Sequence, residues 1–506
     1  MTPPPPSPAP ETVLAVTLTP GLLLRRTLQS FLLQVLLKAR GFIVVPIYAR
    51  LLDPAGLGVI TLAGAVCGLL GPVLILGLNL GTGLQIVHLR DREALSRGYC
   101  TTVFFAGACA ILGSILVALG VAHAGEAVSL GSLGSYAAAL ALLLAATALR
   151  DLALLIPQLR QETGFYNGLN LGMDYGAALL GVVLVWKGFG PGGVLWATGG
   201  VVGLGIAVAL SRTLRDLRCG AGFDRAFLAS ALLIGVPGLP IALGQWVLQA
   251  ADNLFLAHYH GEAVVGTYGV AYSLASVVLL VLGALNFVLF PSAATLWSRG
   301  PERLSLFVRR ALHLTVLALG LFVVGACLLS PWGVALLAGT RYAGAATVLP
   351  LMVASWSAYT LMQVLQKVPM VVGRDTVSLA WCYTGTACLN LALNFALIPR
   401  WGMEGAAVAT LVSYLVGLVS MGELARRWLP ALCWWRSLAR PTALVTALGA
   451  AGLALRVPAS GGLLRAVSSA VLLVVLYPLL AKAVGAFTED DWRLLKKAVR
   501  PEGAAA

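Results

Sequence analysis

Charge is scarce in this chain. Only 11% of its 506 residues are Asp, Glu, Lys or Arg, whereas 59% are apolar. An average soluble domain is roughly 25% charged, so this composition excludes a water-soluble globular protein. The mean hydropathy is +0.91, and apolar runs of about 20 residues, each long enough to cross a bilayer, recur from end to end. The composition therefore predicts a polytopic membrane protein.

The chain also lacks the motifs of common catalytic and metal sites. Its eight cysteines are scattered without a CxxC pair, no lysine follows a glycine as in a P-loop, and neither H-E-x-x-H nor G-x-S-x-G occurs. We therefore expect no metal, no cofactor and no ATP hydrolysis, and we interpret the cysteines as small buried apolar residues. The opening MTPPPPSPAP has no basic segment, which argues against a cleaved signal peptide.

The apolar runs predict about 14 transmembrane helices, with both termini on the same side of the membrane. Counted over the connecting segments and the ends of the spans, with Arg150 included, 24 Lys and Arg fall on the side of the termini and 6 fall on the other side. Basic loops stay in the cytoplasm, so both termini are predicted to be cytoplasmic. The net charge of +14 then reflects loops that face anionic lipid, not nucleic acid. The predicted spans are 28–49, 57–82, 100–122, 133–156, 167–187, 193–211, 227–257, 266–292, 308–329, 345–369, 377–398, 404–424, 441–456 and 463–484.

Two segments of the chain resemble each other at a nearly constant offset. Residues 48–58 end the first predicted helix and open the second, and residues 256–266 do the same for the seventh and eighth, 208 residues later. Two predicted Gly-x-x-Gly turns, at 190–193 and 402–405, lie 212 residues apart; a positive φ or a close backbone approach is expected there. Helices 1–6 are thus predicted to repeat as helices 7–12, about an axis along the membrane normal. Transporters often place their substrate between such halves. Chance matching in a Gly- and Leu-rich chain is the alternative.

Polar side chains gather on single faces of five predicted helices. A charge at the centre of a membrane helix costs roughly 2.5–3.5 kcal/mol on insertion scales. Five charged residues within the spans therefore stand out: Lys38, Arg40, Asp174, Asp252 and Lys367. Helical spacings of three, four or seven residues place all of them except Arg40 on the same helix face as a nearby Asn or Gln. We interpret these faces as the lining of a wet cavity. The predicted substrate-binding residues are Gln34, Lys38, Arg40, Asn170, Asp174, Gln245, Gln249, Asp252, Gln363, Lys367, Asn390 and Asn394.

The same polar faces have a structural interpretation, in which they hold neighbouring helices together by hydrogen bonds. For Asp252 there is a further interpretation, in which its carboxylate neutralises one of the cations within the spans. Lys38 and Arg40 lie about 200° apart around their helix, so only one of them is expected to face a cavity fully. A cationic lining suits an anionic cargo such as a pyrophosphate, and the amides suit sugar hydroxyls.

Four segments resemble a known family. Residues 48–58, YARLLDPAGLG, resemble the end of helix 1 in bacterial polysaccharide flippases of the multidrug/oligosaccharidyl-lipid/polysaccharide exporter superfamily. Residues 250–268 resemble that family's segment at helices 7–8, although Asn253 replaces the usual Arg after the aspartate. Phe290-Pro291 resembles the end of the family's helix 8, and residues 401–410 resemble the start of its helix 12.

The resemblance implies an all-α, V-shaped bundle of two six-helix lobes with two further helices. It also implies that an undecaprenyl-pyrophosphate-linked oligosaccharide is moved from the inner to the outer leaflet of the bacterial cytoplasmic membrane by alternating access, for surface polysaccharide export. The expected partners are this lipid-linked oligosaccharide, membrane lipids and polysaccharide polymerase machinery, with no nucleic acid. The expected divisions are a Pro-rich segment at 1–24, an N-lobe at 25–218, a C-lobe at 219–427, helices 13 and 14 at 428–488, and a tail at 489–506.

Other functions stay open from the sequence. A peptidoglycan-precursor flippase and a cation-coupled drug exporter belong to the same superfamily, although a drug exporter for organic cations would favour an acidic cavity. A membrane-embedded glycosyltransferase or polymerase is less favoured, because the predicted outer loops, about 20 residues or fewer, are too short to carry a catalytic domain. The coupling ion, the sugar and the oligomeric state are not encoded in any recognisable pattern.

Overall fold

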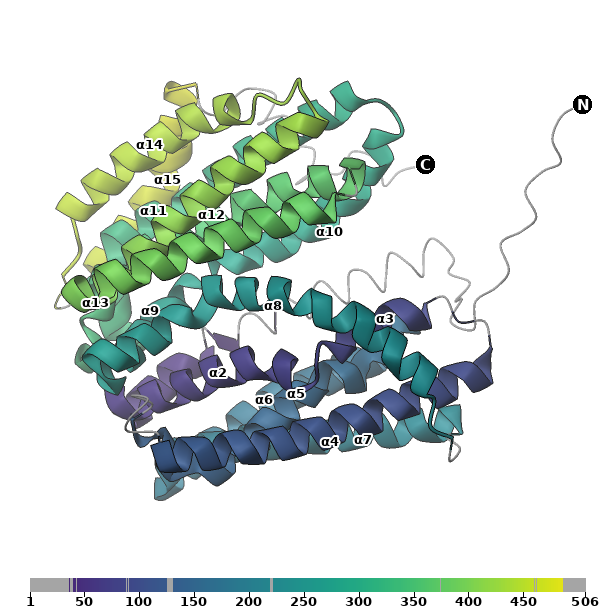
Figure 1. The fold of residues 1–506 in the computed structure, drawn as a ribbon. Helices are drawn as coiled ribbons and strands as arrows, with labels where there is room; N and C mark the ends of the chain where they lie inside the picture. Colours follow the sequence, from purple (N-terminus) through teal and green to yellow (C-terminus); the bar gives the residue numbers. More distant parts are fainter. Residues whose placement is uncertain are drawn as a thin grey trace, which may run out of the picture. The chain divides into compact units, whose positions relative to one another are not determined.

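The regular secondary structure of the chain is helical throughout the part described by the computed structural model (Figure 1). This part comprises residue 36 and residues 40–485, apart from 42, 88, 90, 125–130, 219–221, 374, 459 and 461. The expected all-α fold is confirmed. A helical segment at 43–51 precedes α2 (Pro54–Leu74), α3 (Leu78–Ile86), α4 (Arg92–Ala124), η1 (Gly131–Tyr136), α5 (Ala137–Leu159), α6 (Thr163–Leu184), η2 (Val185–Phe189), α7 (Gly190–Leu217), α8 (Arg225–His260), α9 (Glu262–Ala275), α10 (Val278–Trp297), α11 (Pro301–Leu337), η3 (Thr340–Tyr342), α12 (Ala345–Val368), η4 (Pro369–Gly373), α13 (Thr376–Trp428), α14 (Trp434–Ala454) and α15 (Leu463–Ala483).

Nine helical stretches within the described residues are long and apolar enough to cross a membrane. Two of them, Thr163–Leu217 and Val377–Trp428, each contain two of the predicted spans, so the nine stretches overlap eleven predictions. One of the eleven, 57–82, is wrong as a continuous helix, because α2 ends at Leu74 and α3 begins at Leu78. Among the other three, the span at 28–49 lies largely outside the described residues, and the span at 266–292 is divided between α9 and α10. The span at 441–456 falls in α14.

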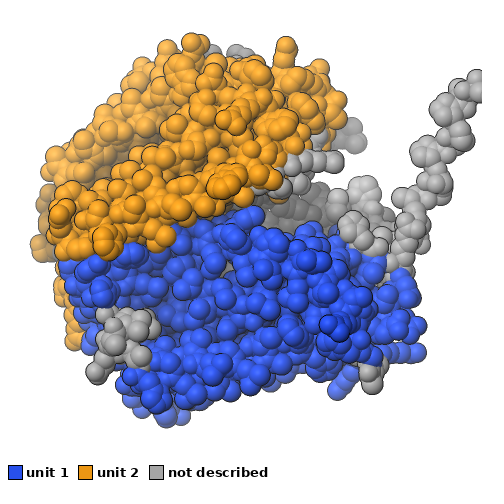
Figure 2. Space-filling view, viewed as in Figure 1, with its two compact units in different colours: residues 1–40, 51–266 blue, residues 41–50, 267–506 orange. Residues whose placement is uncertain are grey.

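Packing contacts divide the chain into two compact units, coloured separately in Figure 2. Unit 1 contains residues 1–40 and 51–266, and unit 2 contains residues 41–50 and 267–506. The helix α8 therefore packs with unit 1, although it follows the expected lobe boundary at residue 218. The expected lobes describe an internal repeat, which packing contacts do not test, and they stay a prediction.

The predicted Gly-x-x-Gly turns interrupt two long helical stretches. Gly190 has a φ of 57° between α6 and α7, and Gly402 has a φ of 53° within α13. Side chains rarely adopt a positive φ, so glycine is the residue that reverses the chain at both places. The expected backbone conformation is thus confirmed at two positions 212 residues apart in the sequence.

Within unit 1, two helix starts cross at backbone distance. A Cβ atom placed on Gly58 of α2 would overlap the carbonyl oxygen of Glu262, and one placed on Gly266 of α9 would overlap the carbonyl oxygen of Pro54. Gly58 and Gly266 are equivalent at the 208-residue offset, and so are Pro54 and Glu262. The crossing is therefore locally two-fold, as small residues permit in membrane helix packing.

The helix α8 is held to α3 in the same way. A Cβ atom on Gly77 or Gly81 of α3 would overlap the carbonyl oxygens of Gly235 and Ala231, which lie one turn apart on α8. Gly77 and Gly81 have no side chain to intervene, so the two backbones approach directly at these positions. This contact, together with α2 packing on α8, explains why α8 belongs to unit 1.

In unit 2, α12 is the central helix, and it packs against α11 and α13 (Figure 1). About 78% of the most apolar window of Ala345–Gly373 is buried, against 11% for α15. The few polar side chains of α12 are therefore surrounded by protein, whereas α15 exposes most of its apolar residues, as a helix facing lipid does.

The cysteines only partly follow the apolar interpretation. Six described cysteines are free, and of these Cys388 is exposed, while Cys100 is disulfide-bonded. The interpretation as buried residues is confirmed for Cys67, Cys100 and Cys327. It is wrong for Cys388, whereas the other three free cysteines are half-buried. The disulfide at Cys100 was not predicted, because spacing alone does not reveal which thiols lie together.

Candidate functional site

Unit 1 holds an ionic cluster at the predicted polar face of α6. Arg150 of α5 binds Asp174 through two bonds, from Nη1 to Oδ1 at 2.9 Å and from Nη2 to Oδ2 at 3.1 Å. Arg40 donates from Nη1 to the same Oδ1 at 2.9 Å. Asn170, one helical turn before Asp174, accepts a bond of 2.7 Å from Arg150 Nη2 and donates to the carbonyl oxygen of Tyr166. We call these four residues (Arg40, Arg150, Asn170 and Asp174) the Arg40–Asp174 cluster.

This cluster carries two guanidinium groups and one carboxylate, a formal charge of +1. The side chain of Asp174 is 15% exposed and that of Arg150 is 24% exposed, whereas that of Arg40 is 38% exposed. Arg150 is thus fixed by a bidentate pair and an amide. Arg40 makes a single bond to the carboxylate and presents its remaining donors to an accessible surface.

Arg150 corrects the expected distribution of charge. The sequence count placed it among basic residues outside the spans, but it lies nine residues before the end of α5 at Leu159, about 14 Å along the helix. Arg150 is therefore a charge within a predicted membrane span and not one of the basic residues of the loops. The predicted pairing of periodic residues missed it because its partners lie on other helices.

The predicted polar residues of α8 also belong to unit 1. Gln245 and Gln249 are half-buried, and among the described residues neither forms a hydrogen bond to the Arg40–Asp174 cluster. Asp252 is 5% exposed, and its Oδ1 accepts from the backbone N–H of Asn253 at 3.0 Å. Asn253, which stands where the resembling family has Arg, donates its amide to the carbonyl oxygen of Ala250.

In unit 2, α12 presents Gln363 and Lys367, both half-buried. Gln363 Nε2 donates to the hydroxyl of Tyr359 at 2.6 Å. The hydroxyl of Tyr383 on α13 donates to Gln366 Oε1 at 2.9 Å. Gln366 was not among the predicted substrate-binding residues, although it lies three residues after Gln363 on the same helical face.

Asn390 and Asn394 do not reach any accessible surface in this conformation. They are 1% and 0% exposed, and Asn394 Nδ2 donates to Asn390 Oδ1 at 3.1 Å. Their helical spacing is real, but the face that they share is packed against protein. The bond joins two residues of the same helix, α13, and among the described residues Asn390 Nδ2 and Asn394 Oδ1 have no hydrogen-bond partner. The structure therefore shows neither a cavity lining nor a bond between neighbouring helices at these two residues. Gln34 and Lys38 lie outside the described residues.

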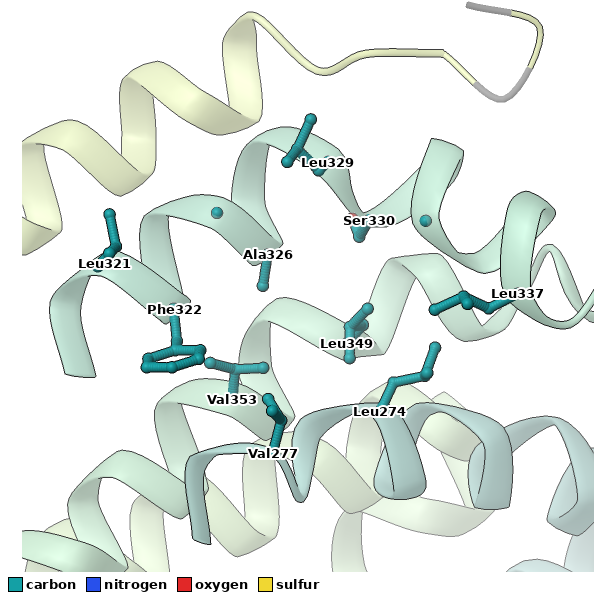
Figure 3. Close-up of a pocket in the computed structure, with 12 residues that line it drawn as sticks. Leu274, Val277, Leu321, Phe322, Ala326, Leu329, Ser330, Leu337, Leu349 and Val353 are labelled. Carbon is teal, nitrogen blue, oxygen red and sulfur yellow. The ribbon is translucent and has the colours of Figure 1, made fainter. Parts of the chain in front are cut away.

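A cavity of about 260 Å³ opens elsewhere in unit 2, between α9, α11 and α12 (Figure 3). Its wall is apolar apart from the hydroxyl of Ser330. None of the predicted substrate-binding residues lines it. Within the described residues, no group of His, Cys, Asp or Glu is placed to hold a metal ion.

Comparisons with known proteins identify the sequence family. Residues 47–347, more than half of the chain, match the model of a family described as polysaccharide biosynthesis protein. An uncharacterized membrane protein of Methanocaldococcus jannaschii is 23% identical over 196 residues. That match covers 38% of this chain, and it spans only 38% of the relative's length.

Solved structures identify the fold. The lipid II flippase MurJ in an inward closed conformation aligns with a TM-score of 0.70 and 11% identity, over 91% of this chain and 99% of MurJ. An inward-facing multidrug resistance transporter of the MATE family, from the MOP superfamily, aligns with a TM-score of 0.61 and 16% identity, over 78% of this chain and 95% of that one. At these identities the likeness establishes a shared polytopic helical fold.

Proposed function

Because this chain belongs to the polysaccharide biosynthesis protein family, we propose that it is a flippase for a lipid-linked oligosaccharide. In this proposal, an undecaprenyl-pyrophosphate-linked oligosaccharide is moved from the inner to the outer leaflet of the bacterial cytoplasmic membrane, for surface polysaccharide export. Transport proceeds by alternating access without ATP hydrolysis by this chain, and both termini are cytoplasmic.

The observation that carries the proposal is the Arg40–Asp174 cluster. An ionised side chain within a membrane span is costly and usually marks the path of a substrate or ion. Here three such charges are bonded together, and the carboxylate of Asp151 lies near enough to act on Arg150. A functional role is therefore indicated by the geometry of Arg40, which makes one bond to Asp174 and is 38% exposed.

Arg40 supplies the chemistry that a phosphate needs. Its guanidinium is a planar fork that binds phosphate oxygens in a bidentate manner. It makes one bond to Asp174 and is 38% exposed, so an incoming pyrophosphate competes with a single contact. Arg150 stays bound to Asp174 and keeps the carboxylate in place during that exchange.

The two superfamily alternatives differ in cargo. A peptidoglycan-precursor flippase also carries a prenyl pyrophosphate, and the cluster suits it equally; the family description favours a polysaccharide precursor. An exporter of organic cations requires a surplus of negative charge where the cargo binds, which this cluster opposes.

The test is transport by purified protein in liposomes. Three cargoes are loaded in one leaflet: an undecaprenyl-pyrophosphate oligosaccharide, lipid II and a fluorescent organic cation. We expect the first to reach the outer leaflet in the wild type, an Arg40→Ala variant to lose most of this transport, and Arg40→Lys to retain part of it. Arg426→Ala is the matched control, because Arg426 pairs only with the exposed Glu423 one turn away within the described residues.

Three results would refute the proposal. One is lipid II transport without oligosaccharide transport, and another is export of the organic cation alone. The third is wild-type transport by Arg40→Ala, which would remove the cationic cluster from the mechanism.

A further inference from the structure

The polar face of α12 in unit 2 has features of a binding surface. Tyr359, Gln363, Gln366 and Lys367 follow one another at spacings of four, three and one residues, so they share one side of the helix. All four are half-buried, although most of α12 is fully buried. We call these four residues the α12 face.

An aromatic cluster holds Tyr359 in place. Its ring centroid lies 5.5 Å from that of Trp356 in an edge-on arrangement and 5.2 Å from that of Tyr414. Trp356 and Tyr414 are 4% and 1% exposed, so they form a rigid backing. Aromatic pairs at these separations are attractive beyond their buried area. Tyr359 therefore presents a preorganised ring and hydroxyl.

The amides of this face are oriented by neighbouring phenols. Gln363 donates to the Tyr359 hydroxyl, and the Tyr383 hydroxyl occupies the carbonyl oxygen of Gln366. The second bond leaves the amide nitrogen of Gln366 as a donor in a fixed orientation. Within the described residues that nitrogen makes no hydrogen bond.

Lys367 adds a charge to the same face. Among the described residues its ammonium group has no hydrogen bond and no ion pair. Lys367 lies in the last turn of α12, one residue before the helix ends, where a cation is favoured. The half-buried ammonium is therefore placed to meet an anion. The α12 face thus combines an aromatic ring, two amides and one cation without a carboxylate.

We propose that the α12 face binds the saccharide part of the cargo, and that it selects a saccharide bearing a carboxylate, such as a uronic acid. This inference rests on the proposed function for the nature of the cargo. Amides and phenols match the paired hydroxyls of a pyranose, an aromatic ring packs against its C–H face, and the ammonium neutralises its carboxylate. A role in helix packing alone accounts for the bond between Tyr383 and Gln366, but it gives the Lys367 ammonium no partner among the described residues.

The test uses a soluble oligosaccharide without lipid or phosphate, so it does not depend on flipping. Full-length protein in nanodiscs is titrated with a glucuronic-acid-containing oligosaccharide, its neutral counterpart and inorganic pyrophosphate, with calorimetry as the readout. We expect the acidic oligosaccharide to bind roughly tenfold more tightly than the neutral one. Lys367→Ala and Lys367→Gln should abolish this preference, and Lys367→Arg should keep most of it.

Further variants separate the parts of the face. Tyr359→Phe should weaken both oligosaccharides equally, since it removes a hydroxyl that does not contact the carboxylate. Lys482→Ala is the matched control, because Lys482 is exposed on α15 of the same unit and should leave both affinities unchanged.

The outcomes distinguish this inference from the proposed function. Absence of saturable binding of the acidic oligosaccharide, equal affinity for both oligosaccharides, or an unchanged preference in Lys367→Ala would overturn it. Competition by pyrophosphate at Lys367 would also overturn it and would assign this lysine to phosphate. If the oligosaccharide binds as expected but the wild type transports no lipid-linked cargo, the saccharide site stands and the proposed transport fails.

Discussion

Removing the carboxylate of Asp174 should destabilise unit 1 by leaving two guanidinium groups without their shared acceptor. Asp174→Leu eliminates three charge-assisted bonds of 2.9–3.1 Å. Breaking a buried ion pair by removing one partner typically costs about 3–5 kcal/mol. Solvent reaches Arg40, at 38% exposure, so its bond contributes little. We therefore expect a loss near the lower limit, about 3 kcal/mol.

A second substitution separates stability from function. Arg150→Met added to Asp174→Leu removes the more buried of the stranded cations. An ion pair replaced by apolar residues of similar volume is often neutral or stabilising, so the double variant should recover more than half of the lost stability. It should not recover transport, because Arg40 no longer has the carboxylate that orients it.

The measurement is the free energy of unfolding in mixed detergent micelles, followed by helical circular dichroism, together with liposome transport. Glu93→Ala is the control, since Glu93 is 75% exposed and its pair with Arg97 should contribute no more than about 0.5 kcal/mol. A loss below about 1 kcal/mol in Asp174→Leu would contradict the energetic role of the carboxylate. If the double variant lost as much stability as the two single variants together, the explanation that Asp174→Leu acts by leaving Arg150 without an anion would be contradicted.

Three further predictions concern the backbone and pH. Gly58→Ala should lower the free energy of unfolding by about 1–3 kcal/mol through overpacking, because the added Cβ overlaps a backbone carbonyl. The control is Gly64→Ala in the same helix, where the added Cβ meets nothing within 4 Å. By the same unfolding measurement, this control should be neutral or stabilising. Gly402→Ala should lower the free energy of unfolding by about 1–3 kcal/mol, because alanine is strained at the positive φ of this position. A thermal midpoint equal to that of the wild type would contradict this prediction. The backbone N–H of Ser378 lowers the pKa of the Asp375 carboxyl, so the capping contribution is present above the usual carboxyl pKa and is lost as pH falls through the lowered value. The protection of the Ser378 amide against hydrogen exchange, taken relative to the intrinsic exchange rate at each pH, should therefore fall in acid. Asp375→Asn should remove that fall, and equal protection profiles in both proteins would exclude the cap as the cause.

The fold could be predicted from the sequence in most respects. Hydropathy located the membrane helices because, without water in the bilayer core, each span must satisfy its own backbone hydrogen bonds. The helix pattern also located Asp174 beside Asn170, since residues one turn apart must share a face. The turns at Gly190 and Gly402 followed from glycine spacing.

The candidate sites were only partly predictable. Arg150 was the main omission, although its position within the predicted span 133–156 signalled an intramembrane charge. Asn390 and Asn394 show the opposite error, because a periodic polar face was equated with an accessible one. Periodicity gives the direction of a side chain around its own helix, but the neighbouring helices determine whether that direction leads to a cavity or to buried protein.

The sequence by itself determined the all-helical class, the approximate position of most spans, the excess of cationic residues and the glycines at the turns, because these depend on local composition and backbone freedom. Only the tertiary structure decided that Asp174 joins Arg40 to Arg150, and that Gly58 meets the start of α9 across a backbone contact. Such contacts depend on the packing of segments far apart in the chain, and no local pattern specifies them.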